Sequence, residues 1–154
     1  MTATMLDVLP GTGDAMLLAS LRGALASELP TVPPGFHVDV RVARERQPTW
    51  TGLGEDKGLV TPAFLMAPDH PVVLAAAAAV GQREDPSRPA RVRPWTFATD
   101  GGWSSGVFGI PTVGFAPGEE RFAHTNRERL DVEEARWAFT RYPERIAAVQ
   151  RAAS

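Results

Sequence analysis

Helix-forming and strand-forming stretches alternate along this chain, and segments rich in glycine and proline separate them. Leucines recur at helical spacing over residues 15–29, where Asp14 is a candidate N-cap, and apolar and polar residues alternate over residues 36–42 as in a half-buried strand. A short apolar stretch at residues 5–9 precedes both. The first third of the chain therefore predicts the order strand, helix, strand, which restricts the fold to classes that combine helices with a sheet.

A connector rich in glycine and proline occupies residues 47–68 and marks the boundary between two structural parts. Beyond it, Asp69 or His70 caps a predicted helix that has Pro71 in its first turn and ends near Gly81. We therefore predict one part at residues 1–60 and a second at residues 61–154.

The second part continues to alternate between helix and strand. Strands are predicted over residues 91–97 and 110–115, and a short helix lies between them at 101–109. An amphipathic helix is predicted over residues 131–142, and Pro143 kinks it or splits off a last turn. Its inward face would comprise Val132, Ala135, Trp137 or Ala138, and Phe139. The overall pattern predicts an α/β fold.

The composition narrows the partners that such a chain can have. The 154 residues carry a net charge of −2 and no basic run, which argues against a nucleic-acid partner and an anionic membrane surface. Cysteine is absent, so a metal would have to be held by carboxylates and histidines, of which we interpret His37 as solvated and His70 as a helix-start residue. The longest apolar run, residues 72–80, is too short to span a bilayer, and we find no signal peptide, so we expect a cytoplasmic protein.

Residue types suited to chemistry are densest between residues 95 and 130. Thr99, Asp100 and Gly101 follow one predicted strand, a glycine–proline loop at residues 114–118 follows the next, and His124 lies in the polar stretch beyond. Loops at the carboxyl ends of strands hold ligands in α/β sheets, and glycine lets main-chain N–H groups approach an anion closely. Asp100 is equally a candidate turn or N-cap residue, and His124 is also a candidate solvated loop histidine.

Three motifs in this region carry a resemblance to a known family. They are Thr-Phe-Ala-Thr-Asp-Gly-Gly at residues 96–102, Gly-Ile-Pro-Thr-Val-Gly-Phe-Ala-Pro-Gly at 109–118 and Ala-His-Thr-Asn-Arg-Glu at 123–128. Together with segments at 6–12, 47–52 and 68–72, they resemble the dinuclear-zinc superfamily of aminoacylases, acetylornithine deacetylases, succinyl-diaminopimelate desuccinylases and glutamate carboxypeptidases. The peptidase or deacetylase branch of that superfamily is the most similar.

The resemblance implies a site with two metal ions, zinc or else cobalt or manganese, which polarise an amide carbonyl. His124 then matches the last metal ligand, and Glu128 matches an acidic group that supports it. The family's loop that holds the substrate carboxylate matches Gly114, Ala116, Pro117 and Gly118. The loop that borders the site matches Thr99, Asp100 and Gly101. The general base and the other ligands match no residue of this chain, so we assign no catalytic residue and expect no tight metal binding by the chain alone.

The resemblance also implies an architecture and partners. Residues 1–60 would be part of a lid or dimerisation domain, a strand–helix–strand half of a ferredoxin-like α+β fold, and residues 61–154 the C-terminal portion of an α/β zinc-peptidase domain. The implied function is that of a C-terminal segment of a metal-dependent amidohydrolase that acts on an N-acyl amino acid or small peptide. It would be inactive without an upstream catalytic segment or a homologous subunit, and a homodimer would form through the lid. The alternative is a non-catalytic remnant that acts as a dimerisation or binding module.

Overall fold

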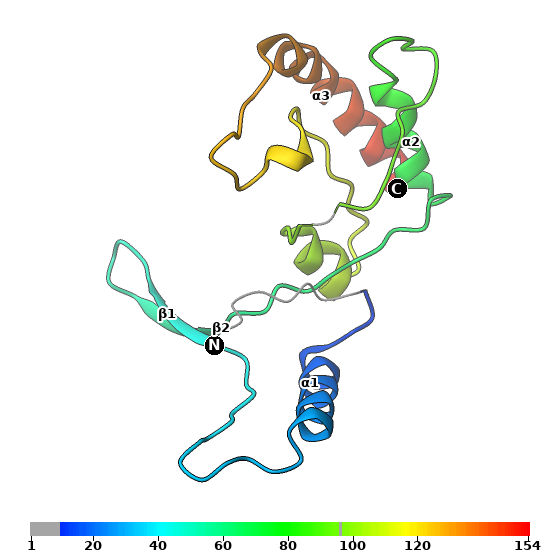
Figure 1. Ribbon diagram of the computed structural model, residues 1–154. Coiled ribbons are helices and arrows are strands. Elements are labelled where there is room, and N and C mark those ends of the chain that lie inside the picture. The colour runs from blue at the N-terminus through cyan, green and yellow to red at the C-terminus, as the bar shows by residue number, and fades with distance from the viewer. Residues whose placement is uncertain (1–9, 96) are drawn as a thin grey trace. The chain divides into compact units, whose positions relative to one another are not determined.

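The computed structural model describes residues 10–95 and 97–154, in which helices are combined with a small two-stranded sheet (Figure 1). The predicted α/β class is therefore confirmed at the level of mixed helices and strands. The described residues gather into two compact units, 10–64 with 97–107 and 65–95 with 108–154, and each is described by itself. The division near residue 60 stays a prediction, and so does the lid that the resemblance implies for residues 1–60. The strand expected at residues 5–9 lies outside the described residues.

Helix α1, Asp14–Glu28, opens the first unit and coincides with the repeat of leucines. Gly13 is its N-cap, so the predicted cap at Asp14 is off by one residue. The Asp14 carboxylate instead accepts a hydrogen bond from the main-chain N–H of Ala15 at 2.8 Å. An acidic side chain in this first turn also interacts favourably with the helix dipole.

A β-hairpin follows, in which β1, Arg44–Pro48, pairs antiparallel with β2, Gly54–Gly58. Arg44 bridges the two strands, because its Nε donates to the Asp56 carboxylate at 3.2 Å and its Nη2 to the Asp56 main-chain oxygen at 2.6 Å. Gly52, with a φ of 83°, allows the turn between them. The connector predicted from residue 47 onward is therefore wrong in its first part. The reason is that these exposed, charged strands carry no hydrophobic alternation.

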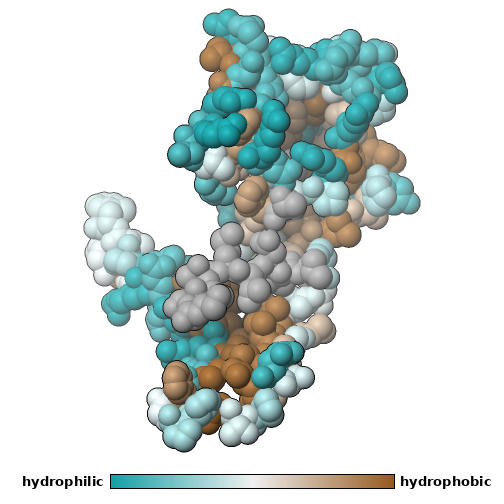
Figure 2. Space-filling model, in the orientation of Figure 1, coloured by the Kyte–Doolittle hydropathy of each residue, from teal (hydrophilic) through white to brown (hydrophobic). Residues whose placement is uncertain are grey.

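The strand predicted over residues 36–42 is wrong, because these residues pair with no strand in the part of the chain that the structure describes. Alternation favours an extended chain, but a strand also needs a partner for its ladder of hydrogen bonds. Here Arg22 of α1 donates to the main-chain oxygen of Val40 at 2.7 Å. Apolar surface stays uncovered in this unit, since Phe36 is 73% and Trp50 98% exposed, and Figure 2 shows apolar side chains at the surface over α1.

A π-helix, Gly102–Val107, completes the first unit where a short helix was predicted. Glycines let it approach residues 62–64 closely, since a Cβ added at any of three positions would meet atoms of that segment. The pairs are Gly101 with the Phe64 ring, Gly102 with the Pro62 main-chain oxygen, and Gly106 with the Ala63 main-chain oxygen at 2.6 Å. Gly101 and Gly102 therefore have a packing role that is independent of any ligand.

Helices α2, Pro71–Val80, and α3, Val132–Ala153, pack side by side in the second unit (Figure 1). The buried side chains between them are small and apolar: Val72, Val73, Ala76, Ala77 and Val80 of α2, and Ala138 of α3. The distance between packed helices depends on the side chains at their contact, so small ones let these two helices approach closely.

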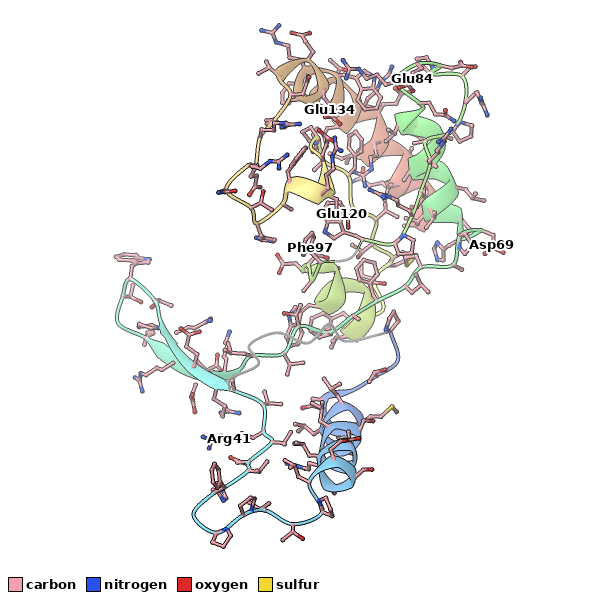
Figure 3. The ribbon with its side chains drawn as sticks, viewed as in Figure 1. Arg41, Asp69, Glu84, Phe97, Glu120 and Glu134 are labelled. Carbon is pink, nitrogen blue, oxygen red and sulfur yellow. The ribbon has the colours of Figure 1, made fainter. Side chains whose placement is uncertain are left out.

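Both helices of the second unit begin where the sequence predicted. His70 caps α2, with its Nδ1 accepting from the main-chain N–H of Val72 at 3.2 Å, and Pro71 is the first helical residue. The Asp131 carboxylate caps α3 by accepting from the main-chain N–H of Glu134 at 2.8 Å; Glu134 is labelled in Figure 3. Side-chain caps satisfy N–H groups that the helix itself leaves unpaired.

Helix α3 differs from the prediction in its end and in its buried face. It continues through Pro143 to Ala153, whereas an end or a split was expected after Tyr142. Phe139 is 76% exposed, while Ala138 and Arg145 are buried. A proline inside a helix costs about 3 kcal/mol or more. Burial of one residue before Pro143 and of another after it holds the helix together across that position.

The strands predicted at residues 91–97 and 110–115 are also wrong. Residues 91–95 and 110–115 take no part in strand pairing, and residue 96 lies outside the described residues. Side chains hold these segments instead of a ladder: Arg93, for example, pairs with the Glu120 carboxylate at 3.0 Å, and Glu120 is labelled in Figure 3. Within residues 10–95 and 97–154, we find no helix that is long and apolar enough to cross a membrane.

Candidate functional site

The residues predicted to border the site, Thr99, Asp100 and Gly101, form the turn that enters the π-helix. Thr99 Oγ1 accepts a hydrogen bond from the main-chain N–H of Gly101 at 3.2 Å. The main-chain oxygen of Asp100 accepts from the N–H of Trp103 at 3.0 Å. Asp100 is therefore a turn residue, one of the two interpretations of the sequence, and Thr99 provides the side-chain cap. The contribution of the exposed Asp100 carboxylate to a site stays a prediction.

The glycine–proline loop, residues 114–118, lies in the second unit and alternates in exposure. Gly114, Ala116 and Gly118 are exposed, while Phe115 and Pro117 are partly buried. The exposed side of the loop thus carries no side chain larger than a methyl group, so a ligand could approach its main chain directly. Gly118 has a φ of 120°, which glycine adopts without strain.

The aromatic ring of Phe115 anchors this loop on α3. It meets Trp137 edge-on at a centroid distance of 6.1 Å and Tyr142 at 5.4 Å. Two hydrogen bonds add to this contact: Tyr142 Oη donates to the Phe115 main-chain oxygen at 3.0 Å, and Arg145 Nη2 donates to the Val113 main-chain oxygen at 2.7 Å. Burial lowers the pKa of Arg145 from its ordinary value, although Tyr142 acts in the opposite direction.

His124 follows a short 3-10 helix, Glu120–Phe122, and its main chain is held by local hydrogen bonds. Its N–H donates to the Glu128 carboxylate at 3.2 Å. The next residue, Thr125, donates its hydroxyl to the Phe122 main-chain oxygen at 2.8 Å and accepts at its own main-chain oxygen from the N–H of Glu128 at 3.2 Å. The Glu128 side chain therefore lies against the main chain of the histidine that the resemblance makes a metal ligand.

The backbone of His124 is left-handed, with a φ of 59°. Within residues 10–95 and 97–154, every other residue with a positive φ is a glycine. A non-glycine residue is uncommon in this conformation, although histidine tolerates it better than most. The hydrogen bond that the Glu128 carboxylate accepts from His124 and the one that the Thr125 hydroxyl donates hold the chain in this conformation, and His124 itself is exposed.

Guanidinium groups surround the ring of Phe122 just before His124. The Cζ atoms of Arg121, Arg127 and Arg129 lie 4.7, 5.7 and 4.0 Å from its centroid. Such contacts are attractive, and Phe122 is buried beneath them. Glu119 offsets part of the positive charge, since its carboxylate accepts from Arg121 Nε at 2.7 Å and lies 3.7 Å from Arg129 Nη2. These contacts fix the loop that carries His124, and the sequence did not predict them.

The predicted site residues are distributed over both units. The glycine–proline loop, His124 and Glu128 belong to the second unit, whereas Thr99, Asp100 and Gly101 belong to the first. The assignment of these two groups to one site stays a prediction.

The described residues do not by themselves fit a metal centre. Zinc sites use three or four protein ligands. Within residues 10–95 and 97–154, no group of three or more His, Asp or Glu residues lies close enough together to hold an ion. His124 could supply one exposed imidazole, and a complete centre would need further ligands.

Sequence reasoning missed the two side chains of α3 that hold the glycine–proline loop, Tyr142 and Arg145. Arg145 follows the buried Ala138 by seven residues, so helical periodicity places it on the inward face. A charged residue at this inward position is unusual for an amphipathic helix, and it could have indicated that Arg145 has a polar partner inside the unit.

Comparison with known proteins gives short, distant matches. Over 83 residues the chain is 35% identical to YgeY of Escherichia coli K12, a protein described as uncharacterized, and this match covers 54% of the chain and 20% of YgeY. Over 97 residues it is 36% identical to the N-formyl-4-amino-5-aminomethyl-2-methylpyrimidine deformylase of Bacillus subtilis 168, which covers 59% of the chain and 22% of the deformylase.

The chain spans about a fifth of the length of these curated relatives. No family model matches it, and no solved structure gives a significant match. One distant relative is thus a hydrolase by name. Membership of the superfamily that the motifs resemble stays a proposal.

Proposed function

We propose that this chain contributes to a metal-dependent amidohydrolase that hydrolyses the amide bond of an N-acyl amino acid or a small peptide. The left-handed backbone of His124, with its φ of 59°, carries the proposal. Sparsely populated backbone conformations cost about 1–3 kcal/mol and cluster at functional sites. The hydrogen bonds that hold His124 in this conformation therefore serve the presentation of its imidazole.

In this proposal His124 supplies one imidazole to a metal ion, and an upstream segment or a homologous subunit provides the remaining ligands. The Glu128 carboxylate fixes the main chain of His124. Main-chain N–H groups of the glycine–proline loop bind the substrate carboxylate. The similarity to a deformylase supports cleavage of an amide, because that relative is named for removing a formyl group from its substrate.

A chimera tests the proposal. This chain replaces the matched stretch of the Bacillus subtilis deformylase, and metal content and deformylation are measured together. We expect the chimera to bind metal and to turn over. His124→Ala should remove about one metal ion per chain and lower the rate by orders of magnitude, since a bound metal contributes several kcal/mol to stabilising a transition state.

His37→Ala is the matched control, because it removes another exposed imidazole from the same chain. It should leave both metal content and rate unchanged. If His124→Ala in an active chimera kept full metal content and a near-normal rate, the assignment of His124 as a ligand would be wrong.

A second candidate function is a non-catalytic dimerisation or binding module. The observation that favours it is the uncovered apolar surface of the first unit, where no residue of α1 is buried and Trp50 is 98% exposed. Sedimentation of the purified chain tests it. A dimer that Trp50→Ser disrupts, combined with a folded but inactive chimera, would favour the module over the enzyme.

A further inference from the structure

We infer that Arg145 and Tyr142 are positioning residues that hold the glycine–proline loop in the conformation that binds a carboxylate. This inference rests on the proposed function, which assigns carboxylate binding to that loop. Both residues lie on α3, and neither belongs to the motifs that suggested the site.

The geometry is that of a two-point attachment. Arg145 Nη2 donates to the Val113 main-chain oxygen at 2.7 Å, and Tyr142 Oη donates to the Phe115 main-chain oxygen at 3.0 Å. Positions three apart on a helix face the same side, and positions two apart on an extended segment do so as well. One face of α3 therefore holds one side of residues 113–115 through two hydrogen bonds, at Val113 and at Phe115.

The ring of Phe115 lies between these two attachments. It meets the Tyr142 ring edge-on at 5.4 Å, and the Arg145 guanidinium carbon lies 5.0 Å from its centroid. Tyr142 thus contacts both the main chain and the ring of Phe115, and Arg145 contacts its ring and the main chain of Val113.

Stability alone does not account for Arg145. Its exposure is only 9%, and no ion pair with a carboxylate is found for it within residues 10–95 and 97–154. Burying a guanidinium without a carboxylate is unfavourable, which also lowers the pKa of Arg145. An apolar residue would fill the space without that penalty, but it could not donate to a main-chain oxygen. Arg145 is thus suited to holding the chain at Val113 in place through its hydrogen bond to the main-chain oxygen.

The attachment decides which side of the loop meets solvent. Because Val113 and Phe115 are held on α3, the residues between and beyond them, Gly114, Ala116 and Gly118, are exposed. In the part of the chain that the structure describes, the main-chain N–H groups of these three residues have no hydrogen-bond partner. They are therefore available to an anion, and a fixed loop avoids the entropy loss of ordering on binding.

Nuclear magnetic resonance of the full chain tests the inference with two readouts. Acetate and N-acetylglycine are titrated while the amide signals of Gly114, Ala116 and Gly118 are followed, and backbone order parameters are measured without ligand. The variants are Tyr142→Phe, Arg145→Met and Arg145→Lys. Tyr142→Phe keeps the ring and removes one hydrogen bond, so it addresses the role of that bond with little risk to the fold.

We expect acetate affinity to fall about three- to tenfold in Tyr142→Phe and about tenfold or more in Arg145→Met, with partial recovery in Arg145→Lys. Order parameters of the loop should drop from about 0.85 to below about 0.6 in Arg145→Met. Val73→Ala is the control, because it weakens the packing of α2, on which Val73 is buried, while leaving both attachments in place. It should leave affinity within about twofold.

The two readouts separate the inference from the proposed function. If the wild-type chain binds neither probe but the loop loses order in the variants, the proposed function fails and the positioning role stands. If the loop keeps its order parameters and its affinity in Tyr142→Phe and Arg145→Met, the positioning role is refuted, whatever the wild-type chain binds.

Discussion

Gly102→Ala is the glycine substitution whose added Cβ would make the closest contact with the rest of the chain. An added Cβ would overlap the main-chain oxygen of Pro62 and lie 2.7 Å from its carbonyl carbon. Gly102 cannot move away easily, because it is buried and its N–H donates to the Thr99 main-chain oxygen at 3.0 Å. Overpacking costs about 1–3 kcal/mol, and we expect about 3 kcal/mol, since the obstacle is backbone and not a flexible side chain.

Hydrogen exchange of the amides in the π-helix measures this loss where it occurs. A destabilisation of about 3 kcal/mol corresponds to exchange that is roughly a hundredfold faster. Gly114→Ala is the matched control, because nothing lies within 4 Å of an added Cβ there and its φ is not positive. If Gly102→Ala exchanged within about threefold of the wild-type rate, the close approach of the π-helix to residues 62–64 would be refuted.

Three further substitutions test the second unit, each by urea denaturation followed by circular dichroism. Asp131→Ala removes the cap of α3 and should lower the free energy of unfolding by about 1 kcal/mol; no change would show that the bond to Glu134 does not stabilise the helix. Val72→Ala opens a cavity at a residue that is 0% exposed and should cost about 2 kcal/mol, and a loss below about 0.5 kcal/mol would contradict its place in the core. Gly118→Ala should cost about 1–3 kcal/mol through its φ of 120° alone, because space around it is open. An unchanged stability would mean that the loop adopts another conformation.

The sequence predicted the helices well because their signals are local. His70 followed by Pro71 marks the start of α2, and Asp131 marks the start of α3 through a side chain that reaches only three residues ahead. The end of α3 was missed, since Pro143 is a local stop signal and the burial of Arg145 beyond it depends on the rest of the unit.

The strands were predicted poorly because pairing is not local. Residues 36–42 and 110–115 alternate or are apolar as strands are, yet within residues 10–95 and 97–154 neither pairs with another strand. The hairpin that does form, β1 with β2, has charged residues on both faces and is exposed, so hydrophobic periodicity could not reveal it. Its signal in the sequence was Gly52, which permits the turn.

The candidate site divides in the same way. His124 and Glu128 were named from a motif that resembles a known family, and their contact spans only four residues. The hydrogen bonds from Arg145 to Val113 and from Tyr142 to Phe115 span 32 and 27 residues. No spacing rule for a single helix or turn reaches that far. The assignment of His124 and Glu128 to a site therefore stays a prediction from motifs, whereas the contacts of Arg145 and Tyr142 with the glycine–proline loop were found only in the structure.

The two parts of the candidate site should respond to substitutions independently, because different residues hold each of them in place. The backbone of His124 is held by Thr125 and Glu128, within its own loop, whereas the glycine–proline loop is held from α3. Loss of the Arg145 side chain should therefore loosen the glycine–proline loop and leave the hydrogen exchange of residues 123–128 unchanged. Glu128→Gln should weaken only the contacts that hold the backbone of His124, because an amide oxygen is a poorer acceptor than a carboxylate. Substrate affinity and metal affinity, if both reside here, would then be separable by single substitutions, since each depends on a different set of hydrogen bonds.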